Sequence, residues 1–306
     1  MRKKSMKNVE KFPLFGKPIV RTPFSEGIEL LHFADTVFGS FLLHDHNYIE
    51  LMLVMDGEIQ VAAEGVLYQV PRKAMVIIPP GCIHRTVVAD GTKRYERMVF
   101  HIFPQYLEAL LKKSDAPFGA DLFTEQVRIL DYSPENFWLF RNFFERAFYC
   151  NHQDAEYQKL IVPCLAVELF VELRRVLQVQ SPARLPATNN FVTATVEYIN
   201  EHFTDPGLTV DEVLESVYIS KGYLSRLFKA YTGSSIYQYI IFKRTALAKE
   251  YLQRGVAVLD TCIACGFSDY TSFLKSFKKI FKVTPSQYRK NIQMEAEGGT
   301  EGFAHF

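Results

Sequence analysis

Residues 220–229 are Ser-Lys-Gly-Tyr-Leu-Ser-Arg-Leu-Phe-Lys, and residues 269–278, 49 positions later, are Asp-Tyr-Thr-Ser-Phe-Leu-Lys-Ser-Phe-Lys. In both stretches large apolar residues recur at helical spacing, so that Leu224 and Phe228 correspond to Phe273 and Phe277. A Gln-Tyr pair at 238–239 recurs at 287–288 with the same offset. This ordered repetition predicts two copies of one helical unit near the end of the chain.

Each copy is preceded by a short apolar segment and a tight turn. The segments span about 210–217 and 259–265, and the second turn contains Gly266. A short helix, a turn and a longer helix form a helix-turn-helix unit. Between the copies, residues 235–252 are expected to form a helix about 27 Å long, at 1.5 Å per residue. Such a spacer would hold the two longer helices about 34 Å apart, one turn of duplex DNA.

The outer face of each longer helix is predicted to contact double-stranded DNA. Arg226 and Lys275 occupy equivalent outer positions and suit guanine edges or phosphates. The region 190–290 holds 13 Lys and Arg against 9 Asp and Glu, so we expect two matched cationic surfaces. A solvated helix face is the alternative. The predicted DNA-binding residues are Ser220, Lys221, Gly222, Ser225, Arg226, Lys229, Tyr270, Thr271, Leu274, Lys275 and Lys278.

The first half of the chain has the pattern of an antiparallel β-structure. From about residue 38 to 103, β-branched and aromatic runs alternate with turn signals such as Asp56-Gly57. Two helices are expected after Ser133, the second over about 155–178 with apolar residues around most of its circumference. The strands would cover one side of this second helix, and a second copy of the chain the other, giving a homodimer. A fully internal helix is the alternative.

The chain resembles the AraC family of transcription regulators in both halves. The motifs are residues 220–229, Arg244 on the spacer helix, and Gly-Phe-Ser-Asp-Tyr-Thr-Ser-Phe-Leu-Lys-Ser-Phe-Lys-Lys at 266–279. The resemblance implies that base-contacting positions fall on Gly222, Ser225, Arg226, Tyr270, Thr271 and Lys275. Lys282 stands where the family usually has Gly after the second recognition helix, at a position that favours positive φ.

A second resemblance, to the two motifs of the cupin barrel, covers the first half. It rests on Gly39-x4-His44-x-His46-x3-Glu50 and Pro79-x-Gly81-x2-His84, although Lys73 replaces the usual opening glycine of the second motif. Alternate residues of a strand share a face, so His44, His46 and Glu50 should point the same way. With His84 they are expected to line a metal-free pocket that hydrogen-bonds a sugar or another small polar effector. A divalent metal on the same four residues is the alternative, and no cofactor is required.

Five dispersed cysteines favour reduced thiols in the cytoplasm over a disulfide framework. Cys262-x-x-Cys265 suggests a redox or zinc motif, but without a second pair it is better explained by buried apolar residues. No apolar run is long enough for a membrane span.

The predicted fold is α+β: an N-terminal cupin-like antiparallel β-barrel with following helices, then an all-α domain of two helix-turn-helix units joined by a long helix. The expected boundaries are 1–130 for the sensing barrel, 131–180 for a helical dimerisation segment, 181–190 for a linker, 191–290 for the DNA-binding domain and 291–306 for a tail.

These features predict a DNA-binding regulator responsive to a small molecule, not an enzyme. Two alternatives remain open: a metal-dependent cupin enzyme with a helical appendage, and a constitutive DNA-binding protein whose barrel only dimerises.

Overall fold

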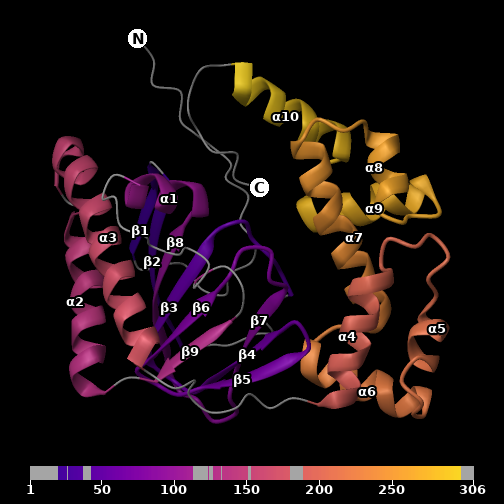
Figure 1. The fold of residues 1–306 in the computed structure, drawn as a ribbon, viewed down its shortest axis with the longest axis horizontal. Helices are drawn as coiled ribbons and strands as arrows, with labels where there is room; N and C mark the ends of the chain where they lie inside the picture. The colour runs from indigo at the N-terminus through magenta and orange to yellow at the C-terminus, as the bar shows by residue number, and fades with distance from the viewer. Residues whose placement is uncertain are drawn as a thin grey trace. The chain divides into compact units, whose positions relative to one another are not determined.

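The computed structural model describes residues 20–25, 27–36, 43–112, 123, 127–131, 133–150, 153–179 and 189–297. These residues form two compact units, one up to residue 188 and one from residue 189, which we call the N-terminal unit and the C-terminal unit (Figure 1). Most of the predicted linker, at 181–188, lies outside the described residues. No described helix has both the length and the apolar composition that crossing a bilayer requires.

The N-terminal unit contains two antiparallel sheets in place of the closed barrel that the sequence suggested. The larger sheet has the order β1 (Val20–Ser25), β2 (Ile28–Asp35), β8 (Tyr95–Ile102), β3 (Ile49–Asp56), β6 (Ala74–Ile78) and β9 (Arg128–Asp131). The smaller sheet has the order β5 (Val66–Val70), β4 (Ile59–Ala63) and β7 (His84–Val88). Within the described residues no ladder joins the two sheets, so they face each other as a cupin-like sandwich.

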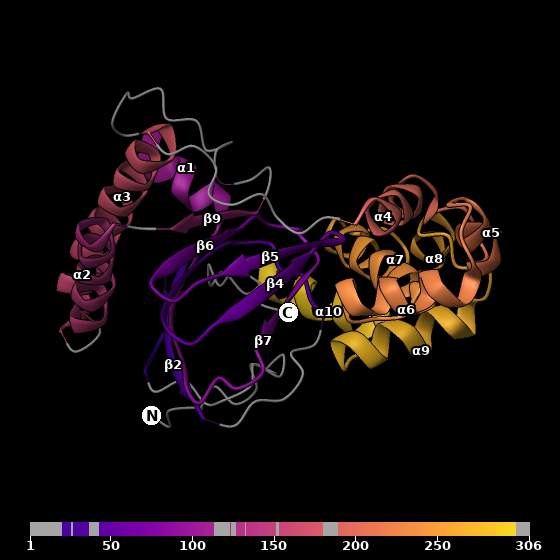
Figure 2. The same cartoon turned by 90° about the horizontal axis from the view of Figure 1, so that it is seen from below.

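Strict alternation along the strands gives the larger sheet two buried faces. Met52 and Val99 point into the core between the sheets, whereas Leu51 and Phe100 point into a second core on the outer face. Three helices cover that outer face: α1 (Pro104–Lys112), α2 (Pro134–Cys150) and α3 (Ala155–Val179). The unit therefore has three layers, with α2 and α3 on one side and the small sheet on the other (Figure 2).

The C-terminal unit is entirely helical over its described residues and confirms the predicted pair of helix-turn-helix units. Its helices are α4 (Asn190–His202), α5 (Val210–Glu215), α6 (Lys221–Thr232), α7 (Ile236–Gln253), α8 (Val258–Ala264), α9 (Tyr270–Phe281) and α10 (Pro285–Glu297). Helices α5 and α6 form the first helix-turn-helix unit, and α8 and α9 the second. The spacer α7 contacts α6, α8, α9 and α10, and it thereby joins the two units.

The repeat recognised in the sequence is explained by helix caps. Ser235 and Gln238 form a reciprocal capping box at the start of α7, and Thr284 and Gln287 make the same pair of backbone contacts before α10. The tyrosine that follows each glutamine, Tyr239 or Tyr288, is buried. The repeated Gln-Tyr pair thus starts a helix and fills a core in both copies.

The turns within the two units adopt left-handed backbone conformations. Tyr218 has φ 53° in the first unit and Gly266 has φ 77° at the corresponding place in the second. After the longer helices, Gly233 has φ 79° and Lys282 has φ 64°. The positive φ predicted for Lys282 is therefore confirmed.

Residues 203–205, just after α4, are held by both halves of the C-terminal unit. Arg244 of α7 donates from Nε to the carbonyl of Phe203 (2.6 Å) and from Nη2 to that of Asp205 (2.8 Å). A Cβ on Gly266 would lie 2.5 Å from the Thr204 carbonyl oxygen, so only glycine fits there. These contacts fix the turn of the second helix-turn-helix unit against the end of α4.

Candidate functional sites

The first candidate site is formed by the exposed faces of α6 and α9. All the predicted DNA-contacting residues are exposed except Leu274, which is half-buried. The opposite faces of the two helices are anchored by Leu224, Phe228, Phe273 and Phe277, each fully buried. Figure 2 shows α6 and α9 along one edge of the C-terminal unit, with α4, α5 and α8 behind them. The structure thus presents the two faces to solvent, as an interface requires.

Of the two recognition helices, α9 has the stronger N-terminal cap and α6 the weaker one. Asp269 accepts hydrogen bonds from the backbone N–H groups of Thr271 (3.2 Å) and Ser272 (2.6 Å). A hydrogen bond from the Ser272 side chain, together with these backbone bonds, lowers the pKa of Asp269. Ser220, at the same position before α6, makes no side-chain cap. Asp269 is therefore a structural residue at the edge of the face.

The expectation of two matched cationic surfaces is wrong for the first unit. Lys221 Nζ lies 2.8 Å from Asp211 Oδ1 and 3.2 Å from Glu215 Oε1, so its charge is already paired. Residues 210–233 contain three acidic and three basic side chains, whereas residues 258–282 contain two and four. The cationic excess belongs to the second unit, because Asp211 and Glu215 of α5 have the apolar counterparts Leu259 and Ile263 in α8 and the second unit has one more basic residue.

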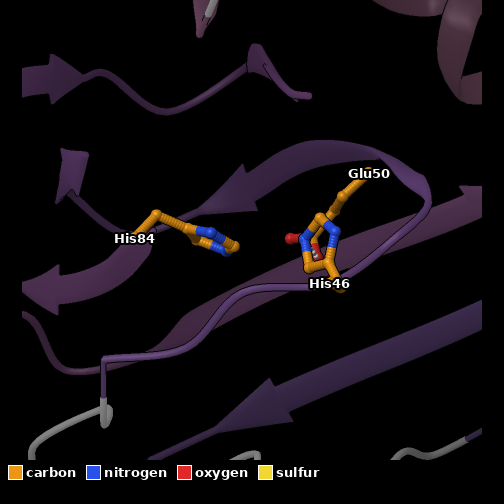
Figure 3. A group of neighbouring side chains, drawn as sticks. All are labelled: His46, Glu50 and His84. Atoms are coloured by element: carbon orange, nitrogen blue, oxygen red, sulfur yellow. Dashed lines mark ion pairs between the residues drawn. The ribbon is translucent and has the colours of Figure 1, made fainter. Parts of the chain in front are cut away.

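The second candidate site is a polar cluster at one end of the sandwich interior. His46, Glu50 and His84 bring one potential ligand atom each to within 4.8 Å of one another, and Figure 3 shows their side chains converging. His46 and His84 are buried, and Glu50 is half-buried. The sequence had grouped these three with His44. His44 lies beside them, its ring centroid 4.2 Å from that of His84, but it is not part of this close group.

The expectation that His44, His46 and Glu50 share the face of one strand is also wrong. His44 pairs with His84 in an isolated bridge, and β3 begins only at Ile49. Between His46 and β3 the chain bends at residues 47–48. His46 Nδ1 donates to the Tyr48 carbonyl across this bend (2.9 Å). This turn, and not strand alternation, brings His46 next to Glu50.

Hydrogen bonding defines the tautomers of the two buried imidazoles. A carbonyl oxygen only accepts, so Nδ1 carries the proton in His46, which faces the Tyr48 carbonyl, and in His84, which faces that of Cys82 (3.0 Å). Because His84 stays neutral, its Nε2 carries a lone pair. Both Nε2 atoms are buried without a hydrogen-bond partner, although His46 Nε2 lies 3.3 Å from Glu50 Oε2. His84 Nε2 and the Glu50 carboxylate therefore both offer acceptors at this point.

The charges of the cluster follow from its burial and its pairing. Burial and the neighbouring imidazoles of His44 and His46 hold the pKa of His84 well below its usual value, so it stays neutral. Burial would raise the pKa of Glu50, but the hydrogen bond from His101 and the His46 imidazole 3.3 Å away outweigh it and hold that pKa well below the usual value. Burial would likewise lower the pKa of His101, but its bonds to Glu29 and Glu50 raise it.

Sequence reasoning missed His101 and Glu29, which complete the cluster from β8 and β2. His101 lies 3.2 Å from Glu50 Oε2 through Nε2 and 3.3 Å from Glu29 Oε2 through Nδ1. Both residues are buried and belong to neighbouring antiparallel strands in register. The signal in the sequence is a polar residue, Glu29 or His101, within an otherwise apolar stretch. That signal can be interpreted only if it is known that the two strands pair.

Comparison with known proteins finds family matches in both units of the chain. A family model described as an AraC-like ligand binding domain matches residues 29–160, and one described as a helix-turn-helix domain matches 213–291. The transposon Tn10 TetD protein of Escherichia coli is 39% identical over 98 residues, which cover 32% of this chain and 71% of TetD. This chain belongs to the AraC family of transcription regulators. It is therefore a DNA-binding regulator with a ligand-binding domain.

This AraC-family chain is also similar to a second regulator and to a solved structure. The regulatory protein PocR of Salmonella typhimurium is 30% identical over 166 residues, and the match spans 52% of this chain and about half, 54%, of PocR. Among solved structures, ToxT of Vibrio cholerae bound to an unsaturated fatty acid is 11% identical, with a TM-score of 0.40 over 88% of this chain and 96% of that one.

The polar cluster of this AraC-family chain also fits a divalent metal ion. Two imidazole nitrogens and a carboxylate are a usual donor set for first-row metals. Each imidazole is oriented by a carbonyl on its other nitrogen, as metal-binding histidines usually are. His46, Glu50 and His84 would hold such an ion, which would supply a Lewis-acidic positive charge at the point where their ligand atoms converge.

The Cys262-x-x-Cys265 pair of this AraC-family chain is buried, as expected for apolar packing. Burial raises the pKa of both thiols, that of Cys265 to about 12. Thiolates at neutral pH are therefore scarce, and the residues instead pack in the core beneath α9.

Proposed function

We propose that this regulator binds a neutral, polyhydroxylated small molecule of the sugar class in the polar cluster, and that the bound effector changes how the protein binds DNA through α6 and α9. The observation that carries the effector class is the pair of buried Nε2 atoms of His46 and His84, neither of which has a hydrogen-bond partner, beside the Glu50 carboxylate. A hydroxyl group both donates and accepts, so it can pair with either imidazole nitrogen and with the carboxylate.

The electrostatics of the cluster narrow the class further. Glu50 is held ionised and His84 neutral, so the convergent atoms present negative charge. A carboxylate or phosphate effector would meet repulsion from the ionised Glu50 there. A sugar supplies several hydroxyl donors without charge, and the stacked rings of His46 and Tyr48, 4.1 Å between centroids, offer an apolar wall.

The same strands connect the cluster to the helices on the outer face. Glu50 and His101 point into the sandwich, while their neighbours Leu51 and Phe100 belong to the outer core. The Phe100 ring lies 6.3 Å from Phe144 of α2 and 6.4 Å from Phe170 of α3. A shift of β3 or β8 on effector binding would therefore reach α2 and α3 directly.

The exposed side of α3 supports self-association as the next step. Leu160 (69% exposed), Cys164 and Val171 follow one another at helical spacing along its outer stripe. Large apolar side chains in a row on a helix commonly mark an interface. We place a second copy of the chain there, so that the effector would adjust the geometry of a homodimer.

The experiment is a melting series of the N-terminal unit against sugars and polyols. Trp138 of α2 is the single tryptophan, so its emission follows this unit alone. A ligand present at 100 times its Kd should stabilise the unit by about 2.7 kcal/mol. Glu50→Gln should abolish this shift, whereas the exposed carboxylate variant Glu58→Gln should keep it. A shift produced only by carboxylates or phosphates would contradict the proposal.

A metal-dependent cupin enzyme is the second candidate, favoured by the fit of His46, Glu50 and His84 to a divalent ion. Elemental analysis of the purified protein tests it. Near-stoichiometric iron, manganese or zinc that is lost in His46→Ala, together with turnover of a substrate, would support it. A metal-free protein whose melting temperature still rises when a polyol is added would favour the ligand-responsive regulator.

A further inference from the structure

The two helix-turn-helix units differ on the helix that precedes each recognition helix. Helices α5 and α8 align with an offset of 48, which pairs Asp211 with Leu259 and Glu215 with Ile263. The recognition helices align with an offset of 49, which pairs Lys221 with Tyr270. One unit therefore has two acids and a lysine where the other has three exposed apolar side chains.

The charged set of the first unit is joined by short contacts. The ammonium of Lys221 bridges Asp211 (2.8 Å) and Glu215 (3.2 Å), and these hydrogen bonds raise its pKa, so that it stays charged. The three side chains together carry a charge of about −1 at neutral pH. All three are more than half exposed. They lie at the start of α6, where a recognition helix approaches the DNA backbone.

Proteins gain sequence-independent affinity for DNA by placing cations against phosphates. A lysine already paired with two carboxylates contributes little, because a phosphate must displace them and meets their repulsion. Arg226 and Lys229 of α6 form no ion pair within the described residues, nor do Lys275 and Lys278 of α9. The deficit in the first unit therefore traces to Asp211 and Glu215.

We propose that Asp211 and Glu215 are specificity-determining residues that withhold Lys221 from DNA phosphates. The first unit then binds only where base contacts by α6 offset the repulsion, and the second unit supplies most of the sequence-independent attraction. This inference rests on the proposed binding of DNA through α6 and α9. It assigns unequal roles to two units that the sequence repeat makes look alike.

The alternative is that the two carboxylates orient Lys221 toward a phosphate. The two ideas predict opposite signs for Asp211→Asn combined with Glu215→Gln, which keeps the shape of both side chains. The probes are a random-sequence duplex of about 30 base pairs and a duplex selected by the wild-type protein from a randomised pool. Binding of the full chain to each is followed by fluorescence anisotropy between 50 and 300 mM salt.

Under the proposal, the double variant binds the random duplex roughly tenfold more tightly at 0.1 M salt. One more phosphate contact makes the slope of log K against log salt steeper by about 0.9. Relative to 1 M salt, this raises the binding constant at 0.1 M by an additional factor of about eight. Preference for the selected duplex over the random one falls. Adding Lys221→Gln to the double variant reverses the gain, whereas Lys221→Gln alone changes wild-type binding less than twofold.

The second unit provides the matched comparison. Lys275→Gln should weaken binding to the random duplex and lower the slope by about 1. Leu259→Asp with Ile263→Glu, which places the same acids beside α9, should weaken it as well. Far-UV circular dichroism checks that each variant keeps its helices.

Two results would overturn the inference. One is unchanged or weaker binding of the random duplex by the Asp211→Asn, Glu215→Gln variant. The other is a loss in Lys221→Gln alone that matches the loss in Lys275→Gln, which would show that Lys221 already holds a phosphate. If the wild-type chain bound no duplex at 50 mM salt, the proposed DNA contacts of α6 and α9 would fail together with this inference, whereas either of the first two results would leave them standing.

Discussion

The turns of the two helix-turn-helix units should respond to substitution in opposite directions. Gly266 and Tyr218 occupy the same left-handed turn position, with φ 77° and 53°. Around Gly266 there is no room for a side chain, because an added Cβ would lie 2.5 Å from the Thr204 carbonyl oxygen and 2.9 Å from that of Phe203. Tyr218 is 96% exposed, so its side chain meets no such obstacle. The cost at this position is therefore only the strain of its left-handed backbone.

The magnitudes follow from these two environments. Gly266→Ala adds the strain of a left-handed residue, about 1–2 kcal/mol, to a backbone overlap of about 1–3 kcal/mol. We therefore expect a loss of roughly 2–5 kcal/mol. Tyr218→Gly removes about 1–2 kcal/mol of strain, and the greater freedom of glycine in the unfolded chain offsets about 0.5–1 kcal/mol of that gain. A net gain of about 0.5–1 kcal/mol is expected.

Thermal unfolding of the full chain measures both effects. The C-terminal unit contains no tryptophan, so its transition appears in far-UV circular dichroism without a matching change in Trp138 emission. For a unit of this size, 1 kcal/mol shifts Tm by roughly 4–8 °C. Gly207→Ala, where an added Cβ meets nothing within 4 Å, is the control and should leave Tm nearly unchanged. A Gly266→Ala protein that melts with the wild type would refute the close approach to residues 203–204.

Three further predictions concern the two candidate sites and the outer helices. Because the folded pKa of His84 lies below its usual 6.5 and that of His101 above it, stability of the N-terminal unit should peak near pH 6.5. His84→Asn should reduce the decline between pH 6.5 and about 4.5, where Glu50 stays ionised, in urea titrations followed by Trp138 emission, and an unchanged decline in that range would be contrary to this. Arg226→Ala should weaken binding to a selected DNA duplex by about 1–3 kcal/mol, whereas Arg254→Ala, at the exposed end of α7, should not; equal effects in anisotropy would count against α6 as a contact surface. Leu160→Glu with Val171→Glu should make the chain monomeric in sedimentation experiments while Gln178→Glu leaves it associated, and a persistent dimer would move the interface away from α3.

Much of the C-terminal unit could be predicted because its signals are local. Helix caps, the i, i+4 apolar pairs such as Leu224 and Phe228, and a positive-φ site at Lys282 depend on residues a few positions apart. Helix α4 was missed, since its apolar spacing carries no repeat to support it. The ion pairs of Lys221 were missed because Asp211 lies across a turn, ten residues away.

The N-terminal unit was predictable in class but not in detail, because its organisation depends on strand pairing. The motifs placed His46, Glu50 and His84 in one group without showing that a turn, not a strand, connects the first two. His101 and Glu29 join them only because β2, β8 and β3 are adjacent in the larger sheet. Such long-range register leaves no mark at short spacing in a single sequence.

The pairing of these strands also explains how a buried effector could influence helices that it never touches. An effector shifts an equilibrium only by the difference between its affinities for two states, and allosteric coupling is typically 1–3 kcal/mol. Coupling of that size can come from a few contacts. On β8, His101 faces the polar cluster and Phe100 faces α2 and α3, and on β3 Glu50 and Leu51 divide in the same way. Because successive side chains of a strand cannot move independently, a displacement of Glu50 or His101 alters the packing of Leu51 or Phe100. For the proposed effector, these two central strands would therefore connect the polar cluster to the helices on the outer face.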